Sequence, residues 1–190
     1  AGKGDYICEN LESSKKAVEE IFNGKFGLAE QVLIEEFLQG DEMSYFVLSD
    51  GKIFKKFNTA QDHKRVGEGD KGKNTGGMGA YSPSGLINAD LDKKIITEIV
   101  NPTFEAIKDM GENYKGFLYV GLMIKNNNPY LIEYNVRMGD PECQTILPLL
   151  ATDLLDLILS CCDETLESQD ILWEERKSMC IVLCSNGYPD

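Results

Sequence analysis

Histidine is almost absent from this chain of 190 residues, and its cysteines are scattered. His63 is the single histidine, and no two of the six cysteines form a Cys-x-x-Cys pair. A structural zinc site needs several cysteine or histidine ligands, so few are available here. We interpret the cysteines as free thiols of a reducing cytoplasm rather than as a disulfide framework. They are Cys8, Cys143, Cys161, Cys162, Cys180 and Cys184.

Long apolar runs and an excess of positive charge are also missing. No apolar run approaches the roughly 20 residues of a membrane span, and no basic stretch leads into an apolar signal segment. Lysine and arginine total 19 against 32 acidic residues, a net charge of −13. This charge opposes binding of the bulk surface to nucleic acid or to an anionic membrane. We therefore expect neither as a partner, and any phosphate site must be local.

What is present suits a folded globular protein. The chain is 42% hydrophobic and 27% charged, which makes disorder improbable and allows one good core or two small ones. It begins with Ala1-Gly-Lys-Gly4, in what resembles the middle of a motif and without a methionine, and it ends on a turn. We expect a fragment of a longer protein.

The segment from Leu131 to Glu142 is the most informative. Side chains alternate along a strand, so Glu133, Asn135 and Arg137 share one face. A carboxylate and an amide oxygen suit a hard divalent cation, and a guanidinium suits a carboxylate or phosphate. The alternative is an edge strand with one solvated polar face. The neighbouring apolar run disfavours it, because unbound charges beside a buried strand are costly. The other face carries Ile132, Tyr134 and Val136.

Periodicity and turn residues predict a largely antiparallel α+β arrangement. The first helix begins at Ser13 or Ser14 as a cap, and Asp50-Gly51 marks a hairpin. Residues 116–124 are apolar on both faces, as in a central strand. Helices are predicted over 15–22, 90–110 and 144–162, and strands over 31–38, 43–48, 53–57, 116–124, 130–136 and 178–184.

Three segments have both a functional and an ordinary interpretation. Glycines 2 and 4 around Lys3 either close on phosphate or form a plain turn. The strand ending at Phe37-Leu38 either pairs its backbone with an adenine edge or has acids that face water. The glycine-rich residues 59–85 are either a functional loop, which we favour, or a mobile linker. His63 is either a base or, as we favour, a surface group.

The most specific motifs of the chain are Gln61-Asp-His-Lys-Arg65, Asn74 to Pro83 and Arg137 to Gln144. Read together with Gly2-Lys-Gly4, Glu35-Glu-Phe-Leu38 and Glu133-Tyr-Asn135, they resemble the motifs of the ATP-grasp ligases, and most closely those of the family that ligates glycine to phosphoribosylamine in purine synthesis. The resemblance covers residues 1–190. It implies an ATP-grasp fold of α+β class, with a mostly antiparallel sheet, flanking helices and a small partial lid. The implied domains are the lid at 1–38, the main catalytic part at 39–175 and the start of a C-terminal domain at 176–190.

The resemblance also implies a nucleotide site. Many ATP-grasp enzymes have a third acidic metal ligand on the preceding strand, but here that stretch is Val120-Gly-Leu122. Water and phosphate are then expected to complete the metal shell. By position, the implied contacts are Gly2, Lys3 and Gly4 with the phosphates, Glu35, Phe37 and Leu38 with adenine, Glu42 with ribose, and Glu133 and Asn135 with Mg²⁺ or Mn²⁺.

The implied reaction is ATP-dependent. The carboxylate of glycine attacks the γ-phosphate, and the amine of phosphoribosylamine then attacks the resulting glycyl phosphate. Arg137 is expected to orient the glycine carboxylate and the transferring phosphoryl group. Asp62 and Asp140 are expected to hold the glycine ammonium or ribose hydroxyls, with residues 74–83 closing over the acceptor.

Two alternatives stay open, namely a non-catalytic ATP-grasp-shaped nucleotide-binding module and another carboxylate–amine ligase of purine synthesis. The intact enzyme is expected to be a cytoplasmic monomer. Its missing parts include the phosphoribosylamine-binding domain, so we expect this fragment alone to bind ATP weakly and to have no ligase activity.

Overall fold

The computed structural model describes residues 6–69 and 71–188, so the predicted loop at Gly2, Lys3 and Gly4 lies outside the described residues. Its helical segments are α1 (Leu11–Phe22), α2 (Ala89–Lys94), a π-helical segment (Ile95–Val100), α3 (Asn101–Asp109), α4 (Cys143–Ile146), a 3₁₀ turn (Leu147–Leu149), α5 (Leu154–Cys162) and a second 3₁₀ turn (Leu166–Ser168). Its strands are β1 (Asp41–Asp50), β2 (Phe54–Lys56), β3 (Gln61–Asp62), β4 (Arg65–Gly67), β5 (Lys71–Asn74), β6 (Gly79–Ser82), β7 (Lys115–Lys125), β8 (Asn128–Asn135) and β9 (Ser178–Ile181).

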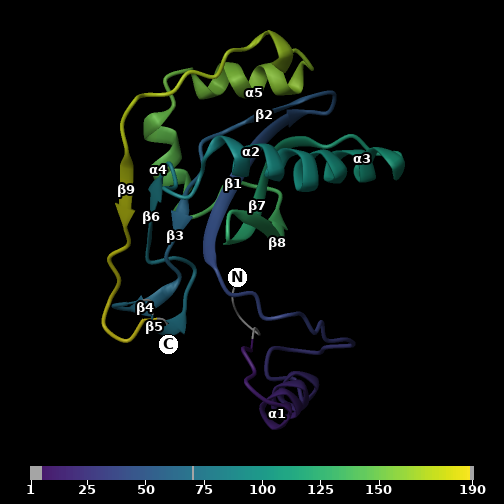
Figure 1. Cartoon of the computed structure of the whole chain (residues 1–190), viewed down its shortest axis with the longest axis vertical. Coiled ribbons are helices and arrows are strands. Elements are labelled where there is room, and N and C mark those ends of the chain that lie inside the picture. The colour runs from purple at the N-terminus through teal and green to yellow at the C-terminus, as the bar shows by residue number, and fades with distance from the viewer. Residues whose placement is uncertain (1–5, 70, 189–190) are drawn as a thin grey trace.

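The body of the protein is a four-stranded antiparallel sheet in the order β2-β1-β7-β8 (Figure 1). β1 pairs with β7 along its whole length. Asn126 and Asn127 join β7 to β8 and have φ angles of 53° and 60°. Positive φ at both turn residues matches the twist of a tight hairpin, and asparagine tolerates it. The antiparallel strands predicted over 43–48, 53–57, 116–124 and 130–136 are confirmed.

Both faces of β1 are buried, which explains its nearly continuous apolar sequence. One face packs under α2, the π-helical segment and α3, and the other packs against α4 and α5. In Figure 1, α2 and α3 lie across the sheet, α5 lies at the upper end and α1 stands apart at the lower end. The first cluster includes Met43, Tyr45, Val47, Leu91, Ile95 and Val100. The second includes Phe46, Leu48, Phe57, Ile146 and Leu157.

The helix predicted over 90–110 is present but changes its pitch in the middle. Asn88 caps it by accepting from the N–H groups of Asp90 and Leu91. At the π-helical segment the N–H of Asn101 bonds to the carbonyl of Ile96, five residues back. The next residue is Pro102, which has no N–H and whose ring clashes with a carbonyl in a regular helix. The wider turn relieves that clash.

Two predicted helix boundaries are wrong. α1 begins at Leu11 because Asn10, rather than Ser13 or Ser14, is the cap, and Ser13 completes a reciprocal capping box. The helix predicted over 144–162 is divided into α4 and α5. The backbone is extended at Leu150, where residues 149–151 bond to residues 172–174 instead. Asp153 then caps α5.

The strand predicted over 31–38 is wrong as well. Residues 31–39 are irregular and pair with no strand among the described residues. Leu33 and Ile34 are 80% and 82% exposed. A strand is stabilised by a hydrogen-bonded partner and by burial of one face, and this segment has neither within residues 6–69 and 71–188.

The glycine-rich segment predicted as a loop over 59–85 consists largely of short strands. β4 and β5 form a ribbon, and β3, β6 and β9 form a three-stranded sheet. β9 therefore lies beside β6, as Figure 1 shows, although about a hundred residues separate them in sequence. Within residues 6–69 and 71–188 no helix is long and apolar enough to cross a membrane. All six cysteines are free thiols.

Candidate active site

β8 carries the predicted metal-binding face, and its register is irregular. Gly121 on β7 pairs with Glu133, but the next β7 residue, Leu122, pairs with Leu131, which leaves Ile132 as an extra residue. Such a bulge breaks the alternation of side chains. As a result Ile132 lines the same cavity as Glu133. Its predicted place on the opposite face is wrong.

This cavity has a volume of about 210 Å³ and collects polar residues from distant parts of the chain. Most of the charged groups that line it are carboxylates, opposed by Lys64 and Arg137. Such a surplus of negative charge would repel a phosphate unless a cation bound with it. The lining residues are Glu42, Asp62, Lys64, Asn74, Thr75, Gly76, Tyr119, Ile132, Glu133, Asn135, Arg137, Gly139, Asp140 and Glu142.

Glu133 and Asn135, both on β8, supply a carboxylate and an amide oxygen to this cavity, and Mg²⁺ accepts ligands of both types. Gly121 lies opposite Glu133, and a Cβ there would come within 3.0 Å of the Glu133 Cγ. A side chain at this position would therefore need Glu133 and Tyr119 to shift. The described residues contain no group of three or more histidine, cysteine or acidic side chains arranged to hold a metal. Mg²⁺ commonly binds through one or two protein oxygens together with water and phosphate, so the pair fits a nucleotide-bound ion.

Arg137 and Asp140 follow β8 and are both exposed where they line the cavity. Arg137 Nη1 donates to the Met138 carbonyl at 2.9 Å. Asp140 Oδ1 accepts from Gln144 Nε2 at 2.6 Å. Arg137 can release its own backbone contact at little cost when it binds an anion, because such exposed contacts are weak.

Lys64 is a site residue to which sequence reasoning assigned no role. Its Nζ lies 3.1 Å from Glu42 Oε2, the acid expected at ribose. Burial opposes the positive charge of Lys64, but Glu42 and Tyr119 outweigh it and raise its pKa. The available signal was its position two residues after Asp62, since residues at that spacing share a face in extended chain.

Asp62 has the most perturbed carboxyl group of the cavity. Its burial, reinforced by the negative charge of Glu142, raises its pKa to about 7. Its Oδ1 is buried and is the one such side-chain oxygen or nitrogen in the described chain without a hydrogen-bond partner. Glu142 is 3% exposed and accepts from Ser44 Oγ at 2.8 Å. Asp62 and Glu142 thus lie close enough for the negative charge of Glu142 to raise the pKa of Asp62.

The segment expected to close over the acceptor, 74–83, has two parts. Residues 79–82 form β6, and the buried Ser82 donates to the Thr59 carbonyl at 2.7 Å instead of facing a ligand. The earlier part borders the cavity at Asn74, Thr75 and Gly76. There Thr75 Oγ1 donates to the Lys64 carbonyl at 2.8 Å, which holds the segment against the cavity wall.

A second cavity of about 450 Å³ adjoins the first, because Glu42 and Ile132 line both. Its walls are α1 on one side and Met123 and Leu131 on the other. The expected adenine contacts Glu35, Phe37 and Leu38 also line it, although their backbone is not a strand. The two cavities together extend from an apolar cleft to the polar groups of β8.

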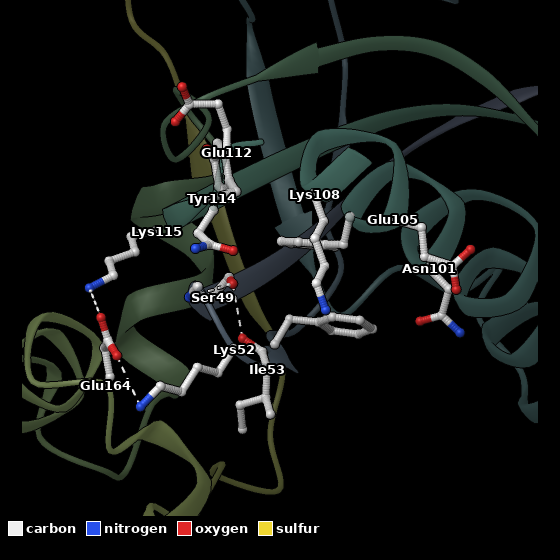
Figure 2. A pocket seen from close by; sticks show the side chains of 14 residues that line it. Ser49, Lys52, Ile53, Asn101, Glu105, Lys108, Glu112, Tyr114, Lys115 and Glu164 are labelled. Atoms are coloured by element: carbon white, nitrogen blue, oxygen red, sulfur yellow. Dashed lines mark hydrogen bonds and ion pairs between the residues drawn. The ribbon is translucent and has the colours of Figure 1, made fainter. Parts of the chain in front are cut away.

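A third cavity, of about 690 Å³, lies elsewhere and shares no residue with either of these. It is bordered by the β1–β2 turn, α3 and the turn after α5. Figure 2 shows Lys52 and Lys115 reaching Glu164 from two sides, and the N–O distances are 2.9 and 2.5 Å. Its most prominent charges neutralise each other, so we place no chemistry there.

The chain is similar in sequence to relatives with known names. Over its full length the chain is 44% identical to a phosphoribosylamine–glycine ligase of Rhizobium meliloti and 46% identical to one of Pasteurella multocida. In each case it covers 45% of the relative. The chain thus spans less than half the length of these curated relatives.

Solved structures agree. The crystal structure of phosphoribosylamine–glycine ligase from Thermotoga maritima matches the whole chain with a TM-score of 0.90 and 34% identity, and the match covers 48% of that protein. A biotin carboxylase from Campylobacter jejuni, 18% identical with a TM-score of 0.65, shares the fold. The family model for the ATP-grasp (A) domain of phosphoribosylglycinamide synthetase matches residues 1–143. The chain has the predicted ATP-grasp fold and belongs to the phosphoribosylglycinamide synthetase family.

Proposed function

We propose that this chain is the ATP-binding part of an enzyme that ligates glycine to phosphoribosylamine, forming glycinamide ribonucleotide, ADP and phosphate through glycyl phosphate. The observation that carries the proposal is the shared cavity of Glu133, Asn135 and Arg137, which adjoins a cleft large enough for a nucleotide base. The names of the full-length relatives support the choice of substrates.

The nucleotide is proposed to lie across the two joined cavities. Adenine enters the cleft lined by Glu35, Phe37 and Leu38, where apolar walls favour a flat ring. The ribose lies near Glu42, which belongs to both cavities. The phosphates then reach Glu133 on β8. Gly2, Lys3 and Gly4 are proposed to cover the phosphates from the lid.

Glu133 and Asn135 are proposed to hold Mg²⁺ or Mn²⁺, with water and phosphate oxygens as the remaining ligands. When bound, the ion neutralises charge that accumulates on the transferring phosphoryl group. This role suits a cavity in which carboxylates outnumber cationic groups.

The protein's own cations bring two anions together. Arg137 orients the glycine carboxylate towards the phosphoryl group, which a planar guanidinium does well because it can make paired hydrogen bonds. Lys64 adds a second positive charge at the cavity wall. Asp140 is proposed to hold the glycine ammonium or a ribose hydroxyl. Asp62, which lines the same cavity, is proposed to act on the amine of the acceptor instead. Residues 74–76 border the acceptor.

The division into 1–38, 39–175 and 176–190 stays a proposal. β9 starts within the last segment, and its pairing with β6 joins that segment to the main part. A monomeric, cytoplasmic enzyme is likewise proposed.

The proposal is tested in a chimera in which this chain replaces the matching segment of the Rhizobium meliloti relative. We expect ADP release from Mg-ATP that requires both glycine and phosphoribosylamine. The unmodified relative is the positive control, and the Glu133→Ala chimera is the negative one. ADP release by a folded chimera that does not depend on glycine would contradict the proposal, as would a nucleotide-binding chimera that releases no ADP. The chain alone is expected to bind ATP weakly and to be inactive.

A further inference from the structure

Asp62 stands apart from the other acids of the cavity. Glu42 pairs with Lys64, Asp140 accepts from Gln144, and Glu142 accepts from Ser44. By contrast, Asp62 Oδ1 is buried without any donor, the one case of its kind among side chains in the described residues. A buried oxygen without a donor favours the protonated carboxyl group over the carboxylate.

The position of this carboxyl group is closely determined. Asp62 ends β3, which pairs with β6 at Ala80. A Cβ on Gly77 would lie 2.9 Å from Asp62 Oδ1 and 2.4 Å from Pro141 Cδ. The backbone at Gly77 therefore packs closely against that oxygen. Asp62 nevertheless lines the cavity that contains Glu133 and Arg137. The carboxyl group is therefore fixed on one side and open to the cavity on the other.

We propose that Asp62 is the general base of the second step, the attack of an amine on the acyl phosphate. This inference rests on the proposed function. The amine nitrogen forms a bond to the acyl carbon, the bond from that carbon to the phosphate oxygen breaks, and its electron pair leaves with phosphate. The proton lost by the nitrogen passes to Asp62, which later releases it to solvent through the cavity.

The charges that face Asp62 suit this task. Glu142, which precedes α4, and Glu42 on β1 favour the protonated form, while Lys64 and the backbone of His63 favour the carboxylate. Burial, which is the largest cause, together with these charges raises its pKa to about 7, where a carboxyl group both accepts and returns a proton. A permanent carboxylate would suit a fixed counter-ion for an ammonium group better. His63 itself is exposed and does not line the cavity.

The test separates the two steps in the chimera described above. Hydroxylamine, a small nucleophile that needs no protein base, traps the acyl phosphate as a hydroxamate and reports the first step. Transfer to phosphoribosylamine reports the second. The variant is Asp62→Asn, which keeps the shape of the side chain, and the matched control is Asp109→Asn at the exposed end of α3.

We expect Asp62→Asn to form hydroxamate within about twofold of the parent and to lose about 100-fold or more in transfer, since general bases contribute about 10²–10⁴-fold. The parent's transfer rate should fall below pH 7, and the residual transfer of the variant should not. Unchanged transfer would overturn the inference. So would equal losses in both steps, or a raised KM for glycine with kcat unchanged, which would indicate ammonium binding. If the parent forms no hydroxamate, the proposed function itself fails.

Discussion

Gly139 lies against the carboxylate of Glu142, and a Cβ on Gly139 would come within 2.3 Å of Glu142 Oε2. Glu142 is buried and accepts from Ser44 across 98 residues of sequence. The glycine thus allows the turn after β8 to hold a buried acid at the cavity that Glu133 and Asn135 also line.

Gly139→Ala is therefore expected to displace Glu142 from Ser44 and to lower the free energy of unfolding by about 1–3 kcal/mol. Urea denaturation measures the loss. Gly85→Ala is the matched control, because a Cβ at Gly85 meets nothing within 4 Å. Equal stabilities of the two variants would show that the turn adapts without cost.

Replacing Asp62 should change how stability depends on pH. Its pKa is about 7 in the folded protein against an ordinary value of 3.8. Between about pH 4 and 7 the folded protein therefore keeps a proton that the unfolded chain has lost, so the unfolding free energy falls as pH rises. Above about pH 7 Asp62 is ionised in both states, so its contribution to the unfolding free energy has been lost and no longer changes with pH.

Asp62→Asn should remove that slope, and the difference from the parent should grow by on the order of 2 kcal/mol between pH 4.5 and 8. Urea denaturation across that range measures it, with Asp109→Asn as a variant expected to keep the slope. A pH-independent difference between Asp62→Asn and the parent would be inconsistent with a raised pKa.

Removing the carboxylate of Glu133 should weaken binding of the magnesium nucleotide. We expect at least a tenfold loss of Mg-ATP affinity for Glu133→Ala in calorimetry, about 1.4 kcal/mol, and a smaller loss for nucleotide without the ion. Glu105→Ala is the control, because Glu105 borders the separate cavity on α3. Unchanged Mg-ATP affinity would argue against the metal face.

The Lys64–Glu42 pair links the polar cavity to the cleft, with side chains 30% and 43% exposed. A double-mutant cycle of Lys64→Met and Glu42→Gln should give a coupling energy of about 0.5–1 kcal/mol in urea denaturation, the range of partly exposed ion pairs. The coupling should shrink at 1 M salt. A coupling energy near zero at low salt would mean that the two charges lie close together without stabilising the folded protein.

Local patterns predicted much of the sheet. Asp50-Gly51 marks the β1–β2 turn because Asp50 accepts from the N–H groups of Lys52 and Ile53, and Gly51 has a φ of 91°. The polar residues Glu133 and Asn135 were also identified from their spacing on β8, and they line one cavity. These features depend on neighbours within a few residues, so the sequence carries them directly.

Other predictions failed where distant partners decide the outcome. The segment at 31–38 has a strand-like composition but no partner strand in the described chain. Residues 149–151, predicted to be helical, instead form backbone hydrogen bonds with residues 172–174. The bulge at Ile132 depends on how β8 meets β7. Composition alone cannot report which segments meet, because pairing is settled by closure of the whole sheet.

The sequence by itself determined the family motifs, the central strands and the side chains that suit a metal-bound nucleotide. Only the tertiary structure brought Asp62 beside Glu142, and Lys64 to Glu42, from parts of the chain far apart in sequence. The reason is physical. The residue type fixes which chemical group a side chain carries, but the pKa of that group depends on the burial and the charges that folding places around it.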